Sequence, residues 1–193
     1  MIEHLDSRFV GQSNLDCISG EGSLLILLPM TLVEQWEGSF GLSKGSYTET
    51  QFRWAGEGTL MTDYDRAAEM SDHFTIKDYF KPIPLGDGVG IVISEDYPTV
   101  WLPSASGGTF VRLTGTEREI FPLIPFIEEA TWSEPLFEYH VNHTDFALFD
   151  PAYRFNDSVE HLPLHLKEGR YSASTVHQKI EKTQIIMHRL IRL

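Results

Sequence analysis

The chain has 193 residues, of which 41% are hydrophobic and 12% are aromatic, so it can form a folded core and is too apolar for a disordered chain. Its 28 acidic and 15 basic residues give a formal net charge of -13. This excess of acid disfavours nucleic-acid binding, because contact with the phosphate backbone depends on Lys and Arg. It favours a macromolecular partner that is basic.

Three features predict a cytoplasmic protein that has no contact with a membrane. Cys17 is the only cysteine, which excludes an internal disulfide and a cysteine-rich zinc site. The first residues, MIEHLDSRFVG, are acidic and lack the apolar run of a signal peptide. The longest apolar run, residues 24–29, is too short to span a bilayer. We expect residues 1–14 to be a loosely attached N-terminal segment.

The first third of the chain predicts one buried strand and two short helices. Residues 23–28 (SLLILL) form a continuous apolar run that is typical of a strand buried on both faces. Residues 32–36 follow at helical spacing, and the Gly-, Ser- and Thr-rich residues 39–58 predict a long loop or loose hairpin. Residues 62–65 (TDYD) resemble a capping box, with a hydroxyl at the N-cap and an acid three residues later, so they predict a short helix.

Short strand candidates separated by Gly, Pro and Asp dominate the rest of the chain. They comprise residues 76–85, 89–94, 99–102, 109–113, 136–141, 146–149, 160–166, 170–177 and 183–193. A helical pattern over residues 120–127 interrupts them, and its two prolines fit only in a first helical turn. The pattern of the last three strands predicts an antiparallel meander, in which residues 167–169 (KEG) form a hairpin loop with Gly169 at the left-handed position.

These elements predict an α+β fold that is mainly β, with antiparallel sheets and two or three short helices in a single domain over residues 1–193. A weak internal echo leaves a second organisation open. The strand that ends at Pro29 and the strand that ends at Asp150 are each followed by an irregular segment and then a hairpin, as expected for two similar β-rich halves. We assign Asp150 a structural role.

Residues 85–103 (LGDGVGIVISEDYPTVWLP) contain three glycines at alternate positions and then an acidic pair. A dinucleotide-binding loop has the spacing G-x-G-x-x-G and opens a helix. Here the spacing is G-x-G-x-G, and a strand candidate follows. Asp87-Gly88 is instead typical of a hairpin turn, so we assign Gly88 a structural role and expect no phosphate site.

The histidines and potential nucleophiles do not indicate an active site. His161 and His165 lie on one face of a predicted strand, and His140 and His143 flank a predicted turn, so we expect no metal and no cofactor. The sequence has no G-x-S-x-G motif, and Cys17 has no basic neighbour to activate it. Carboxylate pairs are too abundant for any one to indicate a glycosidase. A β-rich hydrolase or sugar-active enzyme that uses carboxylates is nevertheless the alternative function.

Exposed acids beside aromatic residues favour a protein-binding surface, because aromatic residues concentrate the binding energy of interfaces. Trp36 and Trp101 have apolar neighbours and are expected to anchor the core. The candidate contact residues are acids at a helix start and at a strand corner, with the adjoining tyrosine: Asp63, Asp65, Glu95, Asp96 and Tyr97. For Asp63 and Asp65, the alternative is that they only cap the helix.

Several stretches occur in a fixed order along the chain, namely GSLLILLPMTLVEQWEG, DYDRA, PIPLGDGVGIVISEDYPTVWLP, GGTFVRL, FALFDPAY, LPLHLKEGRYSAST and IIMHRLIRL. Together, from about Leu15 to the C-terminus, they resemble the immunity protein 21 family of bacterial polymorphic toxin systems. The loop at residues 39–58 is longer than the family's link between WxG and DYDRA, and residues 94–98 (SEDYP) replace a more usual Gly-Asp-Glu-Pro run. The resemblance implies a cytoplasmic protein that binds a cognate toxin domain stoichiometrically and has no catalytic activity.

The leading hypothesis is therefore an immunity protein that neutralises a basic, nuclease-like toxin domain by occluding its active site. The net charge of -13 would steer such a protein toward a basic surface. A carboxylate-using hydrolase and a structural or scaffolding module are the other hypotheses. The sequence leaves the oligomeric state open.

Overall fold

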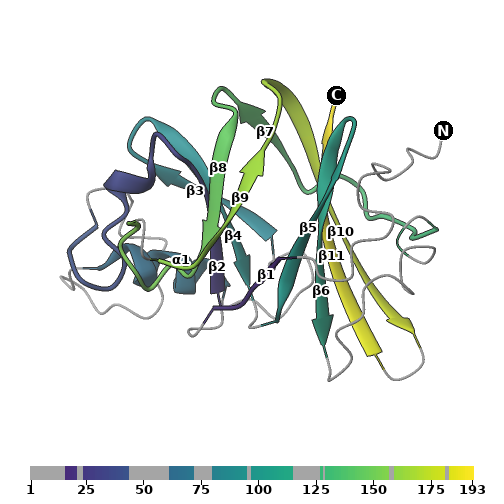
Figure 1. Cartoon of the computed structure of the whole chain (residues 1–193), viewed down its shortest axis with the longest axis horizontal. Coiled ribbons are helices and arrows are strands. Elements are labelled where there is room, and N and C mark those ends of the chain that lie inside the picture. Colours follow the sequence, from purple (N-terminus) through teal and green to yellow (C-terminus); the bar gives the residue numbers. More distant parts are fainter. Residues whose placement is uncertain are drawn as a thin grey trace. The chain divides into compact units, whose positions relative to one another are not determined.

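The structure, a computed structural model, describes residues 16–20, 24–43, 61–71, 80–94, 97–114, 127, 129–156, 159–180 and 183–193. Within these residues the chain is built mainly of strands, with one α-helix and one 3-10 helix (Figure 1). The elements are β1 (Cys17–Ile18), β2 (Leu24–Pro29), η2 (Val33–Gln35), α1 (Asp63–Ser71), β3 (Phe80–Leu85), β4 (Gly88–Ser94), β5 (Thr99–Ser104), β6 (Gly107–Thr114), β7 (Phe137–Val141), β8 (Asp145–Phe149), β9 (His161–His165), β10 (Gly169–Ile180) and β11 (Thr183–Arg192). Strands β2 to β11 all pair antiparallel, so the expected mainly β, α+β fold class is confirmed.

The chain divides into two compact units, each assembled from segments that lie far apart in the sequence. Unit 1 contains Met1–Cys17, Tyr97–Asn142 and Lys167–Leu193, and unit 2 contains Ile18–Asp96 and His143–Leu166. The units are therefore not two successive parts of the sequence. The single cooperative domain and the similarity between two halves stay predictions.

The sheet of unit 2 has the strand order β3-β4-β2-β8-β9. Its central strand β2 has the sequence LLILLP, and all of its residues are buried, as the apolar run at residues 23–28 predicted. β2 pairs with β4 on one side, where Leu24 faces Ser94, and with β8 on the other, where Ile26 faces Phe149. A strand that is covered on both faces needs apolar side chains at consecutive positions, which explains this run.

The edge strands of this sheet contain prolines, at positions 82 and 84 in β3 and at position 163 in β9. Proline has no N–H to donate, so within sheets it is confined mostly to edges and bulges. In β9 the leucines Leu162 and Leu164 are buried while His161 and His165 are more exposed. The expected alternation of this strand is confirmed.

The hairpin between β3 and β4 differs from the predicted one by one residue. Leu85 pairs with Gly88, so the two-residue turn is Gly86-Asp87, and Gly86 has a positive φ of 59°. The prediction that Asp87-Gly88 forms the turn is wrong, because the pairing register selects which of the two flanking glycines adopts positive φ. Gly88 begins β4, where a Cβ atom would lie 2.5 Å from Cδ1 of Leu32.

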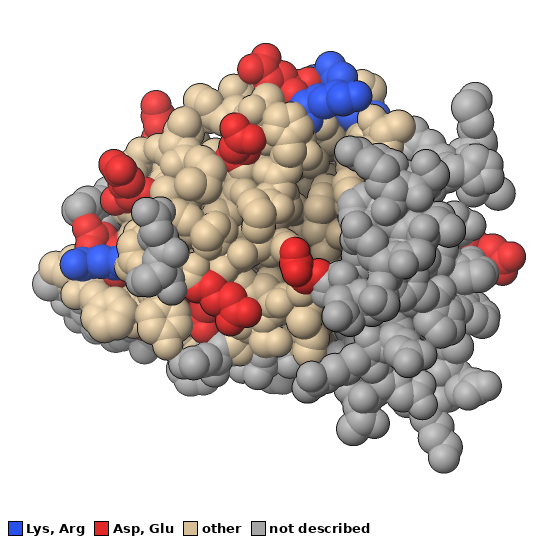
Figure 2. Space-filling model, viewed as in Figure 1, with Lys and Arg blue, Asp and Glu red and all other residues tan. Residues whose placement is uncertain are grey.

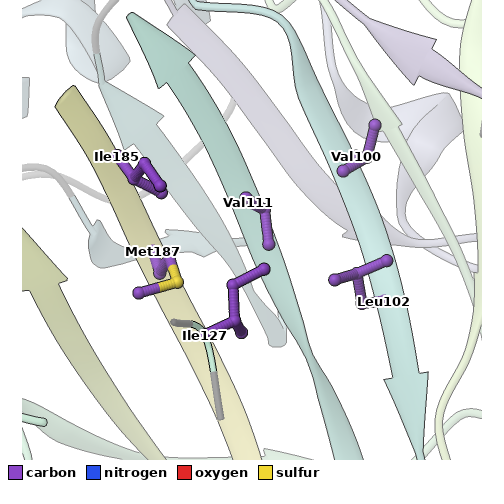
Figure 3. Close-up of a cluster of buried hydrophobic side chains, with 6 residues drawn as sticks. All are labelled: Val100, Leu102, Val111, Ile127, Ile185 and Met187. Atoms are coloured by element: carbon purple, nitrogen blue, oxygen red, sulfur yellow. The ribbon is translucent and has the colours of Figure 1, made fainter. Parts of the chain in front are cut away.

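The sheet of unit 1 has the strand order β1-β5-β6-β11-β10-β7. Its two long strands, β10 and β11, pair from Tyr171 with Arg192 to Ile180 with Thr183. One face of this sheet carries an apolar cluster to which β5, β6 and β11 contribute (Figure 3). The cluster comprises Val100, Leu102, Val111, Ile185 and Met187, with Ile127 packed on them.

The alternate positions of the same strands carry buried polar side chains on the opposite face. Arg112 is fully buried, and its Nε donates to Oγ1 of Thr99 at 3.2 Å. His188 is also fully buried, and its Nδ1 is hydrogen-bonded to Oγ1 of Thr175 at 2.8 Å. Burial, and then the positive charge of Arg112, hold the pKa of His188 well below its usual value.

The predicted meander of the last three strands is wrong. β9 pairs with β8 in unit 2, whereas β10 pairs with β11 and β7 in unit 1. Residues 167–168 therefore connect strands of different sheets, and Gly169 begins β10 opposite Val141 with a φ of 145°. The apolar alternation of β9 and a short Gly-containing connection suit a hairpin, but they do not identify the strand that β9 pairs with.

Three predictions fall largely outside the described residues. The helix at residues 120–127 is described only at Ile127, which is buried. The loop at residues 39–58 is described up to residue 43, and the N-terminal segment 1–14 is not described.

Candidate partner-binding surface

The structure describes three of the five expected contact residues, and these three are divided between the two units. Glu95 and Asp96 lie outside the described residues. Tyr97 belongs to unit 1, where it is half-buried and its ring centroid lies 5.7 Å from Cζ of Arg112. Asp63 and Asp65 belong to unit 2, at the start of α1.

Asp63 is fully buried, so the expectation that it is exposed is wrong. Its Oδ2 accepts the backbone N–H of Glu37 at 2.8 Å, and its Oδ1 accepts the hydroxyl of Ser43 and Nη1 of Arg66, the latter at 3.0 Å. Arg66 is itself buried and also donates from Nη2 to the carbonyl oxygen of Pro84 at 2.5 Å. Asp63 therefore joins residues 37–43 to α1 and, through Arg66, to β3.

Asp65 forms the predicted capping box with Thr62. Its carboxylate accepts the backbone N–H of Thr62 at 2.9 Å, and its own N–H donates to Oγ1 of Thr62 at 3.1 Å. These bonds satisfy donors at the start of the helix that have no partner within it. Asp65 nevertheless remains exposed, so it caps the helix and also presents a negative charge to solvent.

Residues 37–43, the start of α1 and residues 150–156 converge in unit 2, and we call their exposed part the Phe40 surface. The N–H of Ser39 donates to the carbonyl oxygen of Ala152 at 3.0 Å, and the N–H of Tyr64 donates to that of Gly38 at 3.2 Å. Gly38 has a φ of 62°, and a Cβ atom there would lie 2.6 Å from the oxygen of Ala152. A glycine is thus required for the two segments to approach this closely.

Trp36 fixes the position of the first segment in the core. Its side chain is buried, and its indole N–H donates to the carbonyl oxygen of Pro151 at 2.8 Å. Asp150 is also buried, and its Oδ1 accepts the N–H of Ala152 at 2.8 Å, which turns the chain after β8. The backbone under the Phe40 surface is therefore tied to the core at both segments.

The Phe40 surface presents large apolar side chains to solvent. Phe40 is 67% exposed, Leu42 is 53% exposed and Tyr153 is 36% exposed. Beside them Arg154 forms an ion pair with Glu37, with Nη2 and Oε2 2.6 Å apart. Exposed aromatic and apolar side chains framed by charged ones are typical of protein-binding sites.

A cleft of about 500 Å³ opens at this surface. Phe40, Tyr153, Arg154, Asp150 and Glu160 are among the residues that line it. Nearby, burial raises the pKa of Tyr64, and the negative charges of Asp150 and Asp65 raise it further. Two carboxylates, those of Asp150 and Asp65, therefore lie close to Tyr64 beside the cleft.

Acidic side chains also spread over the part of the chain that Figure 2 shows in colour, and basic ones occupy less of that face. This distribution agrees with the net charge of -13. The Phe40 surface therefore lies on a protein whose long-range field attracts cations and basic proteins.

Sequence reasoning missed Phe40, Leu42, Tyr153 and Arg154 as members of one surface. The sequence does contain a signal for Phe40 and Leu42. They lie in the polar, Gly-containing stretch SFGLS at residues 39–43 and do not belong to any helix-like or strand-like apolar pattern. Their proximity to Tyr153 has no such signal, because the two segments are far apart in the sequence.

The remaining candidates lie elsewhere. Trp101 is buried, and its ring centroid lies 4.5 Å from that of Phe110 in unit 1. His140 and His143 are exposed, and His165 is paired with Asp145 at 3.0 Å in an exposed position. Within the described ranges no three or more His, Cys, Asp or Glu residues are grouped so that they could bind a metal ion.

The same part of the chain contains no helix with the length and apolar character needed to cross a membrane. Comparison of the chain with protein-family models, curated proteins and solved structures gave no significant match. The resemblance to the immunity protein 21 family therefore stays an expectation from the sequence stretches that carry it.

Proposed function

We propose that this protein is a non-catalytic immunity protein that binds a basic toxin domain, of nuclease-like charge, and blocks its active site. The observation that carries the proposal is the Phe40 surface, which holds exposed apolar side chains on a fixed backbone within an acidic protein. The resemblance of the ordered sequence stretches to the immunity protein 21 family supports the assignment of the partner as a toxin.

The energetics of the Phe40 surface suit protein binding. Complete burial of a Phe or Leu side chain contributes about 1.5–3 kcal/mol, and Phe40 and Leu42 are 67% and 53% exposed. Their backbone is already held by bonds to Ala152 and Asp63, so binding would cost little additional ordering of the chain. A partner that covers both side chains therefore gains most of their burial energy.

The charge of the protein suits a basic partner. A net charge of -13 accelerates encounter with a basic surface and disfavours acidic competitors. Nucleases are basic where they contact phosphates, so an acidic protein seated over such a cleft would exclude the substrate both sterically and electrostatically.

The proposal predicts that a toxin domain is encoded next to this gene, and co-expression of the two proteins tests it. We expect a stoichiometric complex in which toxin activity is lost, and we expect Phe40→Ala and Leu42→Ala each to weaken binding at least tenfold. Val89→Ala serves as the matched control, because Val89 is an apolar residue of β4 that is 39% exposed and does not belong to the Phe40 surface.

Two results would contradict the proposal. One is an absence of binding to the neighbouring toxin domain, or binding that Phe40→Ala and Leu42→Ala leave unchanged in folded protein. The other is hydrolysis of a glycan by the isolated protein that is lost in Glu160→Gln, which would support the alternative of a carboxylate-using enzyme.

A further inference from the structure

We propose that the cleft of the Phe40 surface is a binding site for an arginine side chain of the basic partner. This inference rests on the proposed function for the identity of the partner, but the chemistry of the cleft can be tested without it. The volume of about 500 Å³ lies in the range of about 300–1,000 Å³ that is usual for ligand pockets. It is therefore large enough for one long side chain.

The charges around the cleft favour a cation. Asp150 and Glu160 line it together with Arg154, and Arg154 is ion-paired with Glu37 at 2.6 Å. The residues that line the cleft therefore carry two negative charges and one positive charge, a net charge of -1, and the positive charge of Arg154 is already paired with Glu37, which does not line the cleft. Burial and then the negative charge of Asp150 raise the pKa of Tyr64, which places the Asp150 carboxylate close to that ring.

The aromatic side chains favour a guanidinium group over an ammonium group. Phe40 and Tyr153 line the cleft and are both exposed to solvent. The planar guanidinium stacks on aromatic faces, is weakly hydrated and binds carboxylates with two parallel hydrogen bonds. An ammonium group is more strongly hydrated and offers no such plane. Aromatic and carboxylate groups in one cleft therefore fit arginine best.

The backbone of the cleft is already ordered in the unbound protein. Asp150 is held by the N–H of Ala152 at 2.8 Å, and Oγ of Ser39 also donates to the carbonyl of Ala152 at 2.9 Å. Glu160 directly precedes β9, which is paired with β8. An arginine that enters would meet the exposed carboxylate of Glu160, and the negative charge of the buried Asp150, on a backbone that is already ordered, which lowers the cost of binding.

A titration with a small probe tests the inference. N-acetyl-L-arginine methylamide is added to the whole protein while amide chemical shifts are followed by NMR. We expect saturable shifts at the amides of Ala152 and Asn156, and we expect the neutral isostere N-acetyl-L-citrulline methylamide to cause none of them. Glu160→Gln and Tyr153→Ala should each raise the dissociation constant roughly threefold to tenfold.

Glu168→Gln is the matched control, because Glu168 is an exposed acid that belongs to unit 1 and does not line the cleft. Its dissociation constant for the arginine probe should equal that of the wild type. Equal shifts from the arginine and citrulline probes, or equal affinity for the corresponding lysine probe, would overturn the inference. The titration contains no toxin, so its outcome is independent of whether the toxin domain is bound and inhibited.

Discussion

The buried carboxylate of Asp63 should contribute much more to stability than the exposed carboxylate of Asp65, although only one residue separates them. Asp63→Ala removes the acceptor for the Glu37 N–H and the charged partner of Arg66, and Asp63 and Arg66 are both buried in unit 2. Breaking a buried charge pair costs about 3–5 kcal/mol. Arg66 keeps its bond to the Pro84 carbonyl, so we expect a loss near the lower end, about 3 kcal/mol.

Asp65→Ala is the matched comparison, because it removes one carboxylate from the same helix turn. It deletes the capping box with Thr62, which is worth about 1 kcal/mol. With an m-value of about 3 kcal/mol/M, urea unfolding midpoints should fall by about 1 M for Asp63→Ala and about 0.3 M for Asp65→Ala. Equal midpoints for the two variants, with unchanged m-values, would refute the assignment of Asp63 as a buried joint.

Further predictions concern the pH dependence of stability, the cost of two glycine substitutions and the salt dependence of the association rate. Because burial and Arg112 lower the pKa of His188, the stability that depends on its neutral form is complete above its unfolded-state pKa of about 6.5. That stability is lost as the pH falls from there toward the folded-state pKa, by up to about 1.4 kcal/mol per pH unit. Urea midpoints should thus drop more between pH 7 and pH 5.5 for the wild type than for His188→Gln, and equal drops would disprove the role of this histidine. Gly107→Ala should cost about 3 kcal/mol or more, because φ is 151° and Cβ would lie 1.9 Å from a backbone carbonyl oxygen. Gly88→Ala should cost about 1–2 kcal/mol, because its Cβ meets a leucine side chain that can move, and a thermal unfolding series that reverses this order would contradict the reasoning. Asp65→Asn should slow association with the proposed toxin domain roughly twofold at low salt and leave it unchanged at about 0.5 M salt, whereas a salt-independent effect would exclude long-range steering.

Local sequence patterns predicted most strands but not their partners. The apolar run at residues 24–28 and the alternation of β9 reflect which faces of each strand are buried. Each pattern lies within one short segment, so it can be recognised from the sequence alone. The pairing of β9 with β8, and not with β10, depends on contacts between distant segments, and a local sequence pattern carries no information about those contacts. The same limit explains the turn at Gly86, since the register of β3 on β4 decides it.

The candidate site shows the same division between local and distant information. The spacing of Thr62 and Asp65 predicted a capping box because both partners lie within one helical turn. The burial of Asp63 depends on Ser43 and Arg66, and the first of these lies twenty residues away. A carboxylate that looks like a surface cap in the sequence is therefore a buried joint in the fold.

In unit 2, the residues that hold the Phe40 surface in place are mostly different from the residues that a partner would contact. The first group should affect stability directly and binding indirectly, and the second group should affect binding alone. Asp63 and Trp36 are buried and fix the segment that carries Phe40. Phe40 itself is 67% exposed, so its removal should cost affinity and little stability. Loss of Asp63 should instead weaken binding indirectly, because the segment would then have to be ordered when the partner binds. Asp65 is exposed and can act on a partner directly, whereas the buried Asp63, two positions earlier, determines where the surface lies.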